Sequence, residues 1–274
     1  MEKVIAKPFV KWAGGKRRQA ALILAHAPEK FGTLYEPFAG GAAVFFECAS
    51  RGPVRAVLGD KNRLLGLTYI GVRDRVEDVI SQLRLMPYDK DFFLEQRSRV
   101  MDPDHNQEPD EIAAWLIYLN RVCFNGLWRV NRKGVFNVPF GRYTNPTICD
   151  ADNLRACSAA LKRTVVKAGD DFHKTVKSAE KGDLVYCDPP YVPVSASADF
   201  TSYTVEGFTW EMQAQLCERA AEMKRRGVHV ILSNADLPVV RKLYKGFKIE
   251  RVEARRNINS DPSKRGAVGE LLIT

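Results

Sequence analysis

An acid, two prolines and an aromatic residue follow a short apolar stretch late in the chain. Residues 184–193 read LVYCDPPYVP, so Asp188, Pro189, Pro190 and Tyr191 come directly after a strand-like run. A proline ring fixes φ and so makes the direction of its backbone carbonyl rigid. The segment therefore offers a carboxylate, a rigid carbonyl oxygen and a ring face at the end of a strand. The plainer alternative is a strand that ends in a proline turn.

A glycine-rich turn lies in the first part of the chain. The apolar run 33–38 is followed by Gly40 and Gly41, and such glycines let the backbone approach a ligand closely at a strand-to-helix turn. Asp60 ends the next apolar run, at the offset where Rossmann-type nucleotide sites place an acid for ribose hydroxyls. The pattern is not G-x-G-x-x-G, so a dinucleotide pyrophosphate is poorly provided for. A turn that only packs is the alternative.

A second Gly-Gly pair lies upstream, in FVKWAGGKRR over residues 9–18. Trp12 and Lys16 flank it. Taken alone, this stretch reads equally well as a basic arm with a packed tryptophan.

Strand-like runs alternate with helical patterns along much of the chain. We expect strands at 33–38, 55–60, 163–169, 183–188, 228–234 and 247–253, and at the closing ELLIT. This alternation predicts an α/β fold with a parallel sheet covered on both faces. A helix is expected from about Thr209, which can cap it, to a stop at Gly227.

The alternation breaks between about 61 and 160, where the chain turns helical and charged. DEIAAWLIYLNRV (110–122) places Ile112, Trp115, Leu116 and Leu119 on one helical face. The turn-prone pair Asn125-Gly126 and a hairpin-like WRVNRKGVFNVPFGRY follow it. This insertion predicts a second, smaller domain. Residues 195–203 read as a loop of small polar residues beside the proline turn.

Composition narrows the class of partner. The chain has 274 residues, 45% of them hydrophobic and 27% charged, with a formal net charge of +9. This excess fits a polyanion such as nucleic acid, although a merely soluble basic protein would also show it. The six cysteines form no C-x-x-C pair, and we expect no metal site. The start of the chain does not read as a secretory signal and no apolar run is long enough to span a membrane, so we expect a cytoplasmic protein.

Four motifs in order carry a family resemblance: FVKWAGGK, EPFAGGAAVFFE, LGDKN and CDPPY. Together they resemble the Dam-type DNA adenine N6-methyltransferases, the alpha group of amino-methyltransferases. The resemblance implies a Rossmann-like methyltransferase sheet, formed by residues 1–60 and 161–274, with an inserted and mostly helical target-recognition domain at 61–160. That domain would include a hairpin near 128–140. One departure is the first motif, usually F-x-G-x-G, which here reads Phe38 to Ala42 with its second glycine one place early.

The resemblance implies S-adenosylmethionine as the cofactor. Trp12 and Lys16 would border its methionine portion, and Asp60 would take the ribose hydroxyls. Asp171 and Phe172 would flank the adenine ring, although Asp170 competes with Asp171. The full implied cofactor set is Trp12, Lys16, Glu36, Phe38, Gly40, Gly41, Asp60, Asp171, Phe172 and Asp188.

The proline turn suits an amino group as acceptor of the methyl. The lone pair of an exocyclic adenine amine is delocalised into the ring, and hydrogen bonds from both of its N–H groups would free that pair. Asp188 can accept one and the Pro189 carbonyl the other, while Tyr191 stacks on the base. The adenine must first be flipped out of the duplex. The implied catalytic set is Asp188, Pro189, Pro190 and Tyr191.

The inserted segment would read double-stranded DNA. Arg129 can fork onto guanine, and Leu127 and Pro139 are apolar enough to meet a thymine methyl. The resemblance implies the target GATC and the DNA-contacting set Lys11, Phe124, Asn125, Leu127, Arg129, Pro139 and Tyr143. The family more usually has tyrosine at the Phe124 position.

Other functions stay open at this point. An amino-methyltransferase for RNA or for protein glutamine tends to carry Asn in place of Asp188. A DNA-binding module without catalysis would have no need of the intact Asp188 and Tyr191. A nicotinamide enzyme lacks support after Asp60. One active site and a palindromic target are most simply served by a monomer.

Overall fold

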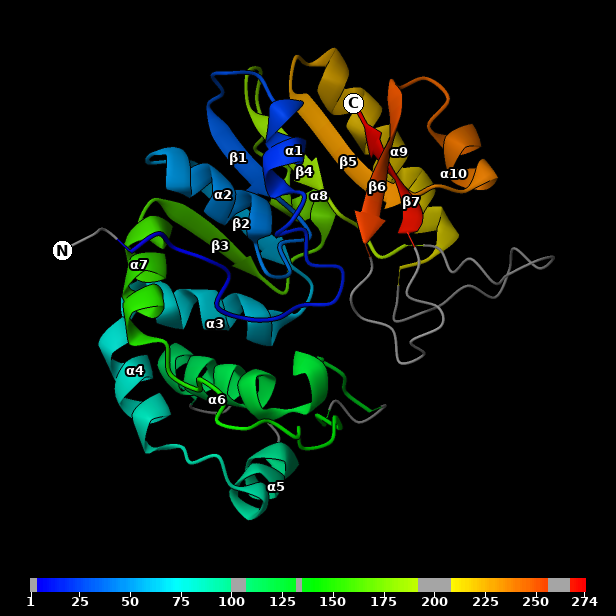
Figure 1. Cartoon of the computed structure of the whole chain (residues 1–274). Coiled ribbons are helices and arrows are strands. Elements are labelled where there is room, and N and C mark those ends of the chain that lie inside the picture. Colours follow the sequence, from blue (N-terminus) through cyan, green and yellow to red (C-terminus); the bar gives the residue numbers. More distant parts are fainter. Residues whose placement is uncertain (1–3, 100–106, 132–134, 192–207, 256–266) are drawn as a thin grey trace.

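The computed structural model describes residues 4–99, 107–131, 135–191, 208–255 and 267–274. Its centre is a seven-stranded sheet in the order β3-β2-β1-β4-β5-β7-β6 (Figure 1). The strands are β1 (Thr33–Glu36), β2 (Arg55–Asp60), β3 (Thr164–Ala168), β4 (Leu184–Cys187), β5 (His229–Ala235), β6 (Ile249–Arg255) and β7 (Ala267–Ile273). The first five run parallel, and β7 lies antiparallel between β5 and β6. All seven expected strands are therefore confirmed.

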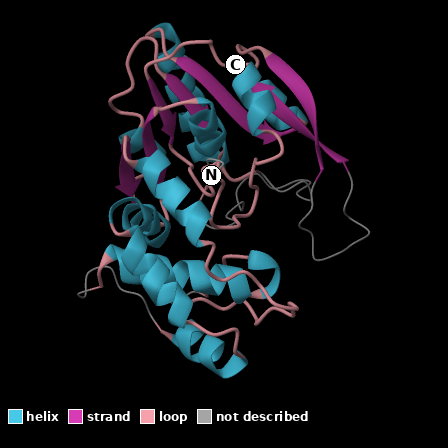
Figure 2. Ribbon diagram, turned by 60° about the vertical axis from the view of Figure 1, so that its left-hand side comes forward, coloured by secondary structure: helices cyan, strands magenta, loops and turns pink. Residues whose placement is uncertain are grey.

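Successive side chains of each central strand point to opposite faces of the sheet, and each face packs into a separate hydrophobic core. Leu34 and Leu184 point into one core, while Tyr35 and Val185 point into the other. The first core is covered by α1 (Ala20–Ala25), α2 (Ala43–Arg51), α3 (Arg63–Asp74) and α7 (Ala151–Leu161). The second is covered by α8 (Phe172–Thr175), α9 (Trp210–Arg225) and α10 (Pro238–Leu243). The α/β fold with helices on both faces is confirmed (Figure 2).

Helix α9 begins and ends where the sequence predicts. The Thr209 side chain accepts a hydrogen bond from the Met212 backbone N–H at 3.3 Å. At the other end Gly227 has φ of +84°, and the N–H of Val228 reaches back to the carbonyl of Met223 at 3.0 Å. This is the left-handed glycine stop that closes many helices.

The inserted helices pack around α6 (Pro109–Val122), below the sheet in Figure 1. Helices α4 (Val76–Leu85) and α5 (Lys90–Ser98) pack against α6 in this group. The sequence predicts one apolar face for α6, but Ala113, Ile117 and Tyr118 outside that face are buried as well. The helix is buried on all sides because α3, α4 and α5 all pack against it. The first core runs without a break from the sheet into this group.

The segment after α6 turns sharply and doubles back. Residues 124–126 form a single turn of 3₁₀ helix in which Asn125 and Gly126 both have positive φ, +56° and +64°. This is the conformation for which the Asn-Gly pair is suited. Isolated antiparallel bridges then join Val130 to Phe136 and Cys123 to Phe140.

Two further sequence expectations concern a loop and membrane-spanning segments. The predicted loop at 195–203 lies outside the described residues. Among the helices that the structure describes, none is long and apolar enough to cross a membrane.

Candidate active site

Three acids lie where parallel strands end. Glu36 is the last residue of β1, Asp60 the last of β2, and Asp188 follows the last residue of β4. Because β1 pairs in parallel with both β2 and β4, their carboxyl ends meet at one edge of the sheet. Ligands of open α/β sheets bind at this edge. The sheet topology thus brings together acids that lie far apart in the sequence.

Lys16 lies at the centre of this edge. Its Nζ is 2.9 Å from Oδ2 of Asp188 and 3.4 Å from Oε1 of Glu270. It also donates a hydrogen bond to the carbonyl of Gly14 at 2.9 Å. The Lys16 side chain is 7% exposed, and those of Asp188 and Glu270 are 18% and 6% exposed. One ammonium group is therefore shared between two largely buried carboxylates.

Burial and charge act in opposite directions on this group. Burial raises the pKa of Asp188, while the Lys16 charge and hydrogen bond work to lower it. Burial would lower the pKa of Lys16, but Asp188 and Glu270 outweigh it and the pKa is raised. Lys16 therefore stays charged and favours the ionised form of Asp188.

Glu36 differs from Asp188 because, among the described residues, no cation pairs with it to offset its burial. One oxygen accepts a hydrogen bond from the Phe45 backbone N–H at 2.5 Å. Burial, outweighing this bond, raises the pKa of Glu36 to about 8, and the negative charge of Asp188 acts in the same direction. In the structure described here Glu36 is thus mainly protonated at neutral pH.

The proline turn is held from both sides. Gln213 of α9 donates to the carbonyl of Pro190 at 3.0 Å. On the other side the Tyr191 hydroxyl donates to Glu270, and the Lys16 ammonium lies 5.0 Å from the centre of the Tyr191 ring. These contacts fix the Tyr191 ring beside Asp188.

Glu270 is the member of this group that sequence reasoning missed. It lies in β7, far along the chain from Asp188, within a segment that reads only as an apolar closing strand. The one available signal is an acid in the apolar run AVGELLIT, where a charge that faces a core needs a partner.

The glycine turn is built around Asp60. Its carboxylate accepts hydrogen bonds from the backbone N–H groups of Gly40 and Asn62, at 3.0 and 2.8 Å. Gly40 has φ of +48°, and a Cβ there would lie 3.0 Å from Cδ1 of Trp12. Glycine at 40 therefore suits both this left-handed backbone and the close approach of the indole.

The shifted glycine of the first motif has a structural counterpart. Ala42, which stands where the family has its second glycine, has φ of +50° and precedes α2. Ala42 thus adopts a left-handed conformation that a glycine would adopt freely. Alanine accepts this region at a cost of about 1 kcal/mol.

Aromatic rings pack beside the glycine turn on both faces of the sheet. The indole of Trp12 stacks on that of Trp128 with ring centres 5.9 Å apart. On the second face of the sheet Phe38 stacks on Phe172 at 5.7 Å, and Phe208 meets both rings edge-on. Phe208 has no motif in the sequence that would single it out.

Asp171 has a structural task of its own. Its side chain caps α8 by accepting a hydrogen bond from the Lys174 backbone N–H at 2.9 Å. The Asp171 carboxylate is thus held directly beside Phe172.

A second group of predicted residues gathers around Asn120 of α6. The Asn120 amide accepts from the Lys11 backbone N–H at 2.7 Å and donates to the carbonyls of Lys11 and Gly126, at 2.8 and 2.9 Å. The ammonium of Lys11 lies 5.5 Å from the Tyr143 ring centre. Lys11, the Asn125-Gly126 turn and Tyr143 are therefore brought together, although they come from distant parts of the sequence.

The other predicted DNA contacts lie on the hairpin beside this group. Arg129 donates to the side-chain and backbone oxygens of Asn137, at 2.7 and 3.3 Å. The carbonyl of Pro139 accepts from the Phe124 backbone N–H at 2.8 Å. Phe124 is 47% exposed, whereas Leu127 packs partly against the core.

Comparison with known proteins identifies the family. The model of the D12 class N6 adenine-specific DNA methyltransferases matches residues 12–258. This chain belongs to that family. The type II methyltransferase M1.LlaDCHI of Lactococcus lactis subsp. cremoris is 41% identical, over 99% of this chain and 96% of its own length. The DNA adenine methylase of Escherichia coli is 35% identical, over 97% of this chain and 94% of its own.

Membership of this family excludes the alternative functions that the sequence left open. A nicotinamide enzyme, an RNA or protein methyltransferase and an inactive DNA-binding module do not fit a chain that is related over its whole length to DNA adenine methyltransferases. The enzyme acts on DNA and modifies N6 of adenine. Lys11 and Glu270 lie outside the matched residues 12–258, so their contacts with the site come from the structure.

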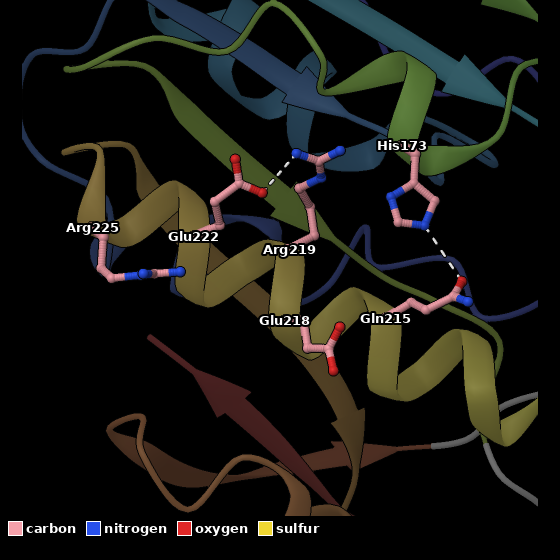
Figure 3. Close-up of a pocket in the computed structure, with 6 residues that line it drawn as sticks. All are labelled: His173, Gln215, Glu218, Arg219, Glu222 and Arg225. Atoms are coloured by element: carbon pink, nitrogen blue, oxygen red, sulfur yellow. Dashed lines mark hydrogen bonds and ion pairs between the residues drawn. The ribbon is translucent and has the colours of Figure 1, made fainter.

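The methyltransferase also has an open cavity of about 570 Å³ between α8 and α9, away from these acids. Figure 3 shows its lining residues, among which Arg219 pairs with Glu222 at 2.7 Å and His173 meets Gln215 at 3.4 Å. Four of the polar side chains therefore interact in two pairs. None of the cavity's lining residues belongs to the predicted site.

Within the described part of the chain, no three His, Cys, Asp or Glu side chains gather as a metal site.

Proposed function

We propose that this methyltransferase carries a methyl group from S-adenosylmethionine to N6 of a flipped-out adenine in the duplex sequence GATC. The observation that carries the proposal is the ion pair of Asp188 with Lys16, placed beside the proline turn and the Tyr191 ring. It provides a desolvated but charged acceptor at the one place where a base could stack on Tyr191.

The proposed roles of the turn follow from its hydrogen bonds. Lys16 holds Oδ2 of Asp188, so the other oxygen remains to accept one N–H of the adenine amine. The Pro189 carbonyl accepts the second, in a direction that the proline rings and the Gln213 contact keep rigid. Both bonds draw the amine lone pair out of conjugation. The proton that leaves after transfer passes to Asp188 or to water.

The cofactor would bind across the ends of β1, β2 and β4. When bound it supplies an electrophilic methyl on a positively charged sulfur. The residues present fit such a group, because the carboxylates of Asp188 and Glu270 carry more negative charge than the single Lys16 ammonium offsets. Asp60 would take the ribose hydroxyls, and Phe172 and Asp171 the adenine side.

Lys16 and Trp12 would border the methionine portion. The Lys16 ammonium already has acceptors on Gly14, Asp188 and Glu270, so its first task in this proposal is to balance Asp188. A cofactor carboxylate would share that ammonium. Glu36, Phe38, Gly40 and Gly41 would hold the amino-acid end.

The DNA target would be read by residues gathered around Asn120. Arg129 would fork onto a guanine, with its plane set in advance by Asn137, and Lys11 would contact the other guanine. Leu127 and Pro139 would meet thymine methyl groups, while Phe124, Asn125 and Tyr143 would border the vacated space. Residues 61–160, including the hairpin near 128–140, would form the target-recognition part. A monomeric state and a cytoplasmic location stay predictions.

Digestion of DNA tests the specificity. The chain is expressed in cells that lack adenine methylation, and their DNA is digested with one nuclease blocked by methylated GATC and another that requires it. We expect protection from the first and cleavage by the second. Unchanged digests with N6-methyladenine present would refute GATC alone, whereas absence of N6-methyladenine would refute the activity.

An Asp188→Ala variant tests the catalytic assignment. We expect turnover to be lost while the variant still binds duplex DNA. Turnover near that of the unchanged protein would remove Asp188 from the mechanism.

A further inference from the structure

The Tyr191 hydroxyl lies between two carboxylates. It donates its hydrogen bond to Glu270, and Asp188 lies close enough for the same hydroxyl to influence its pKa. A phenol has one proton and can fully donate to one acceptor at a time. Which carboxylate receives it decides how many acceptor positions Asp188 has left for a substrate.

The Glu270 carboxylate is held in a fixed position from which it can accept the Tyr191 hydrogen bond. It lies on β7, paired with Ala235 of β5 on one side and Val252 of β6 on the other. Oε2 accepts a hydrogen bond from Gln19 at 3.0 Å, while Oε1 receives Tyr191 and lies 3.4 Å from the Lys16 ammonium. The carboxylate is thus held from the strand and from the segment that precedes α1.

We propose that Glu270 is a positioning residue for methyl transfer, which takes up the Tyr191 hydroxyl and shares the Lys16 ammonium so that one oxygen of Asp188 stays free for the adenine amine. The inference rests on the proposed function, in which Asp188 and Tyr191 meet the base. Without Glu270, Tyr191 would turn to Asp188. Lys16 and Tyr191 would then occupy both of its oxygens in competition with the amine.

Because the Glu270 charge acts on Asp188, the positioning role of Glu270 should be visible in the pH dependence of the rate. The titratable groups of the described residues that lie near Asp188 are Lys16, Glu270, Glu36, Tyr186, Cys187 and Tyr191. The negative charge of Glu270 works to raise the pKa of Asp188. Transfer requires ionised Asp188, so the rate falls as pH drops through its pKa. Removing the Glu270 charge lowers that pKa and moves the acid limb of the rate profile to lower pH.

The test is a cycle of variants assayed for kcat, for the KM of a GATC duplex and for the pH profile. In Glu270→Leu, which removes both the charge and the hydrogen-bond acceptor, we expect kcat to fall about thirtyfold while the KM changes by less than about threefold, because the loss is in the transition state. The acid limb should move to lower pH. Adding Tyr191→Phe to Glu270→Leu should recover about threefold or more of kcat, since no hydroxyl then competes for Asp188.

Two further variants keep the result interpretable. Glu270→Asp keeps the negative charge, but its shorter side chain moves the carboxylate away from the Tyr191 hydroxyl. We therefore expect kcat to fall while the acid limb of the pH profile stays in place. This second variant carries the test if Glu270→Leu does not fold, as judged by its melting temperature. Glu250→Gln removes an equal charge from an exposed side chain on β6 and should change neither kcat nor the pH profile.

An unchanged kcat and pH profile in Glu270→Leu would overturn the proposal. So would a double variant whose kcat is no higher than that of Glu270→Leu alone. Asp188→Ala separates this outcome from failure of the proposed function. If Asp188→Ala is inactive and Glu270→Leu is normal, only the role of Glu270 falls, whereas an active Asp188→Ala removes the catalytic assignment itself.

Discussion

The sheet edge proposed for catalysis and the turn proposed to face DNA use charge in opposite ways. At the edge, the buried Lys16 ammonium contacts two carboxylates, those of Asp188 and Glu270. At the turn, the neutral amide of Asn120 joins two backbone segments and carries no charge. A buried carboxylate is costly and is kept where chemistry needs it. Where only position matters, a neutral amide suffices and leaves the Lys11 and Asn125 side chains exposed.

Removing Lys16 should break the catalytic edge most severely. In Lys16→Met, Asp188 would lose its closest cation, and we expect kcat to fall at least about a hundredfold at neutral pH because the carboxylate becomes protonated. Breaking a buried ion pair on one side also destabilises a fold by about 3 kcal/mol. Single-turnover rates and thermal melts measure both effects. A near-normal rate would show that Asp188 needs no counter-ion.

The pH dependence of stability should be carried in part by Glu36. Its pKa of about 8 in the folded protein lies well above that of an unfolded glutamate. The protonated form therefore stabilises the fold fully at pH below about 4.5, and this contribution is lost as pH rises through 8. The slope is at most about 1.4 kcal/mol per pH unit. Denaturant unfolding of Glu36→Gln across this window should show a flatter profile; an identical profile would contradict the burial of Glu36.

The Asn120 amide should matter for DNA and not for the methyl donor. In Asn120→Asp, a carboxylate would face the carbonyls of Lys11 and Gly126 in place of an NH₂ group. We expect the KM for a GATC duplex to rise about tenfold, the range for a lost buried hydrogen bond. Donor affinity, measured by calorimetry without DNA, should stay within about twofold. Equal losses in both affinities would show that the two regions are not independent.

A matched pair of glycine variants sharpens the same contrast. In Gly40→Ala the new Cβ meets Trp12, and in Gly126→Ala it lies 2.4 Å from Cδ of Lys11. Both positions have positive φ, so each variant also carries a backbone cost of about 1 kcal/mol. Gly40→Ala should weaken donor binding about fivefold and Gly126→Ala should weaken DNA binding by a similar factor. Titration of both ligands against both variants checks this, and a reversed pattern would contradict the assignment of the two regions.

Much of the catalytic edge could be predicted from local sequence. Asp60 and Asp188 end apolar strand-like runs, and the sheet topology then requires them to lie at one edge. Glu270 could not be predicted in this way, because its partners Lys16 and Tyr191 lie before α1 and after β4 and are joined to it only by the fold. Long-range pairing of buried charges leaves no local pattern.

The DNA-facing turn shows the same limit in another form. The Asn125-Gly126 pair predicts its own turn, since both residues favour positive φ. Asn120 reads as a polar interruption in an apolar helix, and nothing near it in sequence indicates that it binds the backbone of Lys11. The burial of α6 beyond the predicted apolar face has a related cause, because its further contacts come from helices elsewhere in the chain.

The most direct measurement of the central claim is a crystal structure with a GATC duplex and an unreactive analogue of the methyl donor. We expect the adenine to be flipped out and stacked on Tyr191, with its N6 about 3 Å from both an oxygen of Asp188 and the carbonyl of Pro189. An adenine held elsewhere, with neither oxygen in contact with N6, would contradict the account.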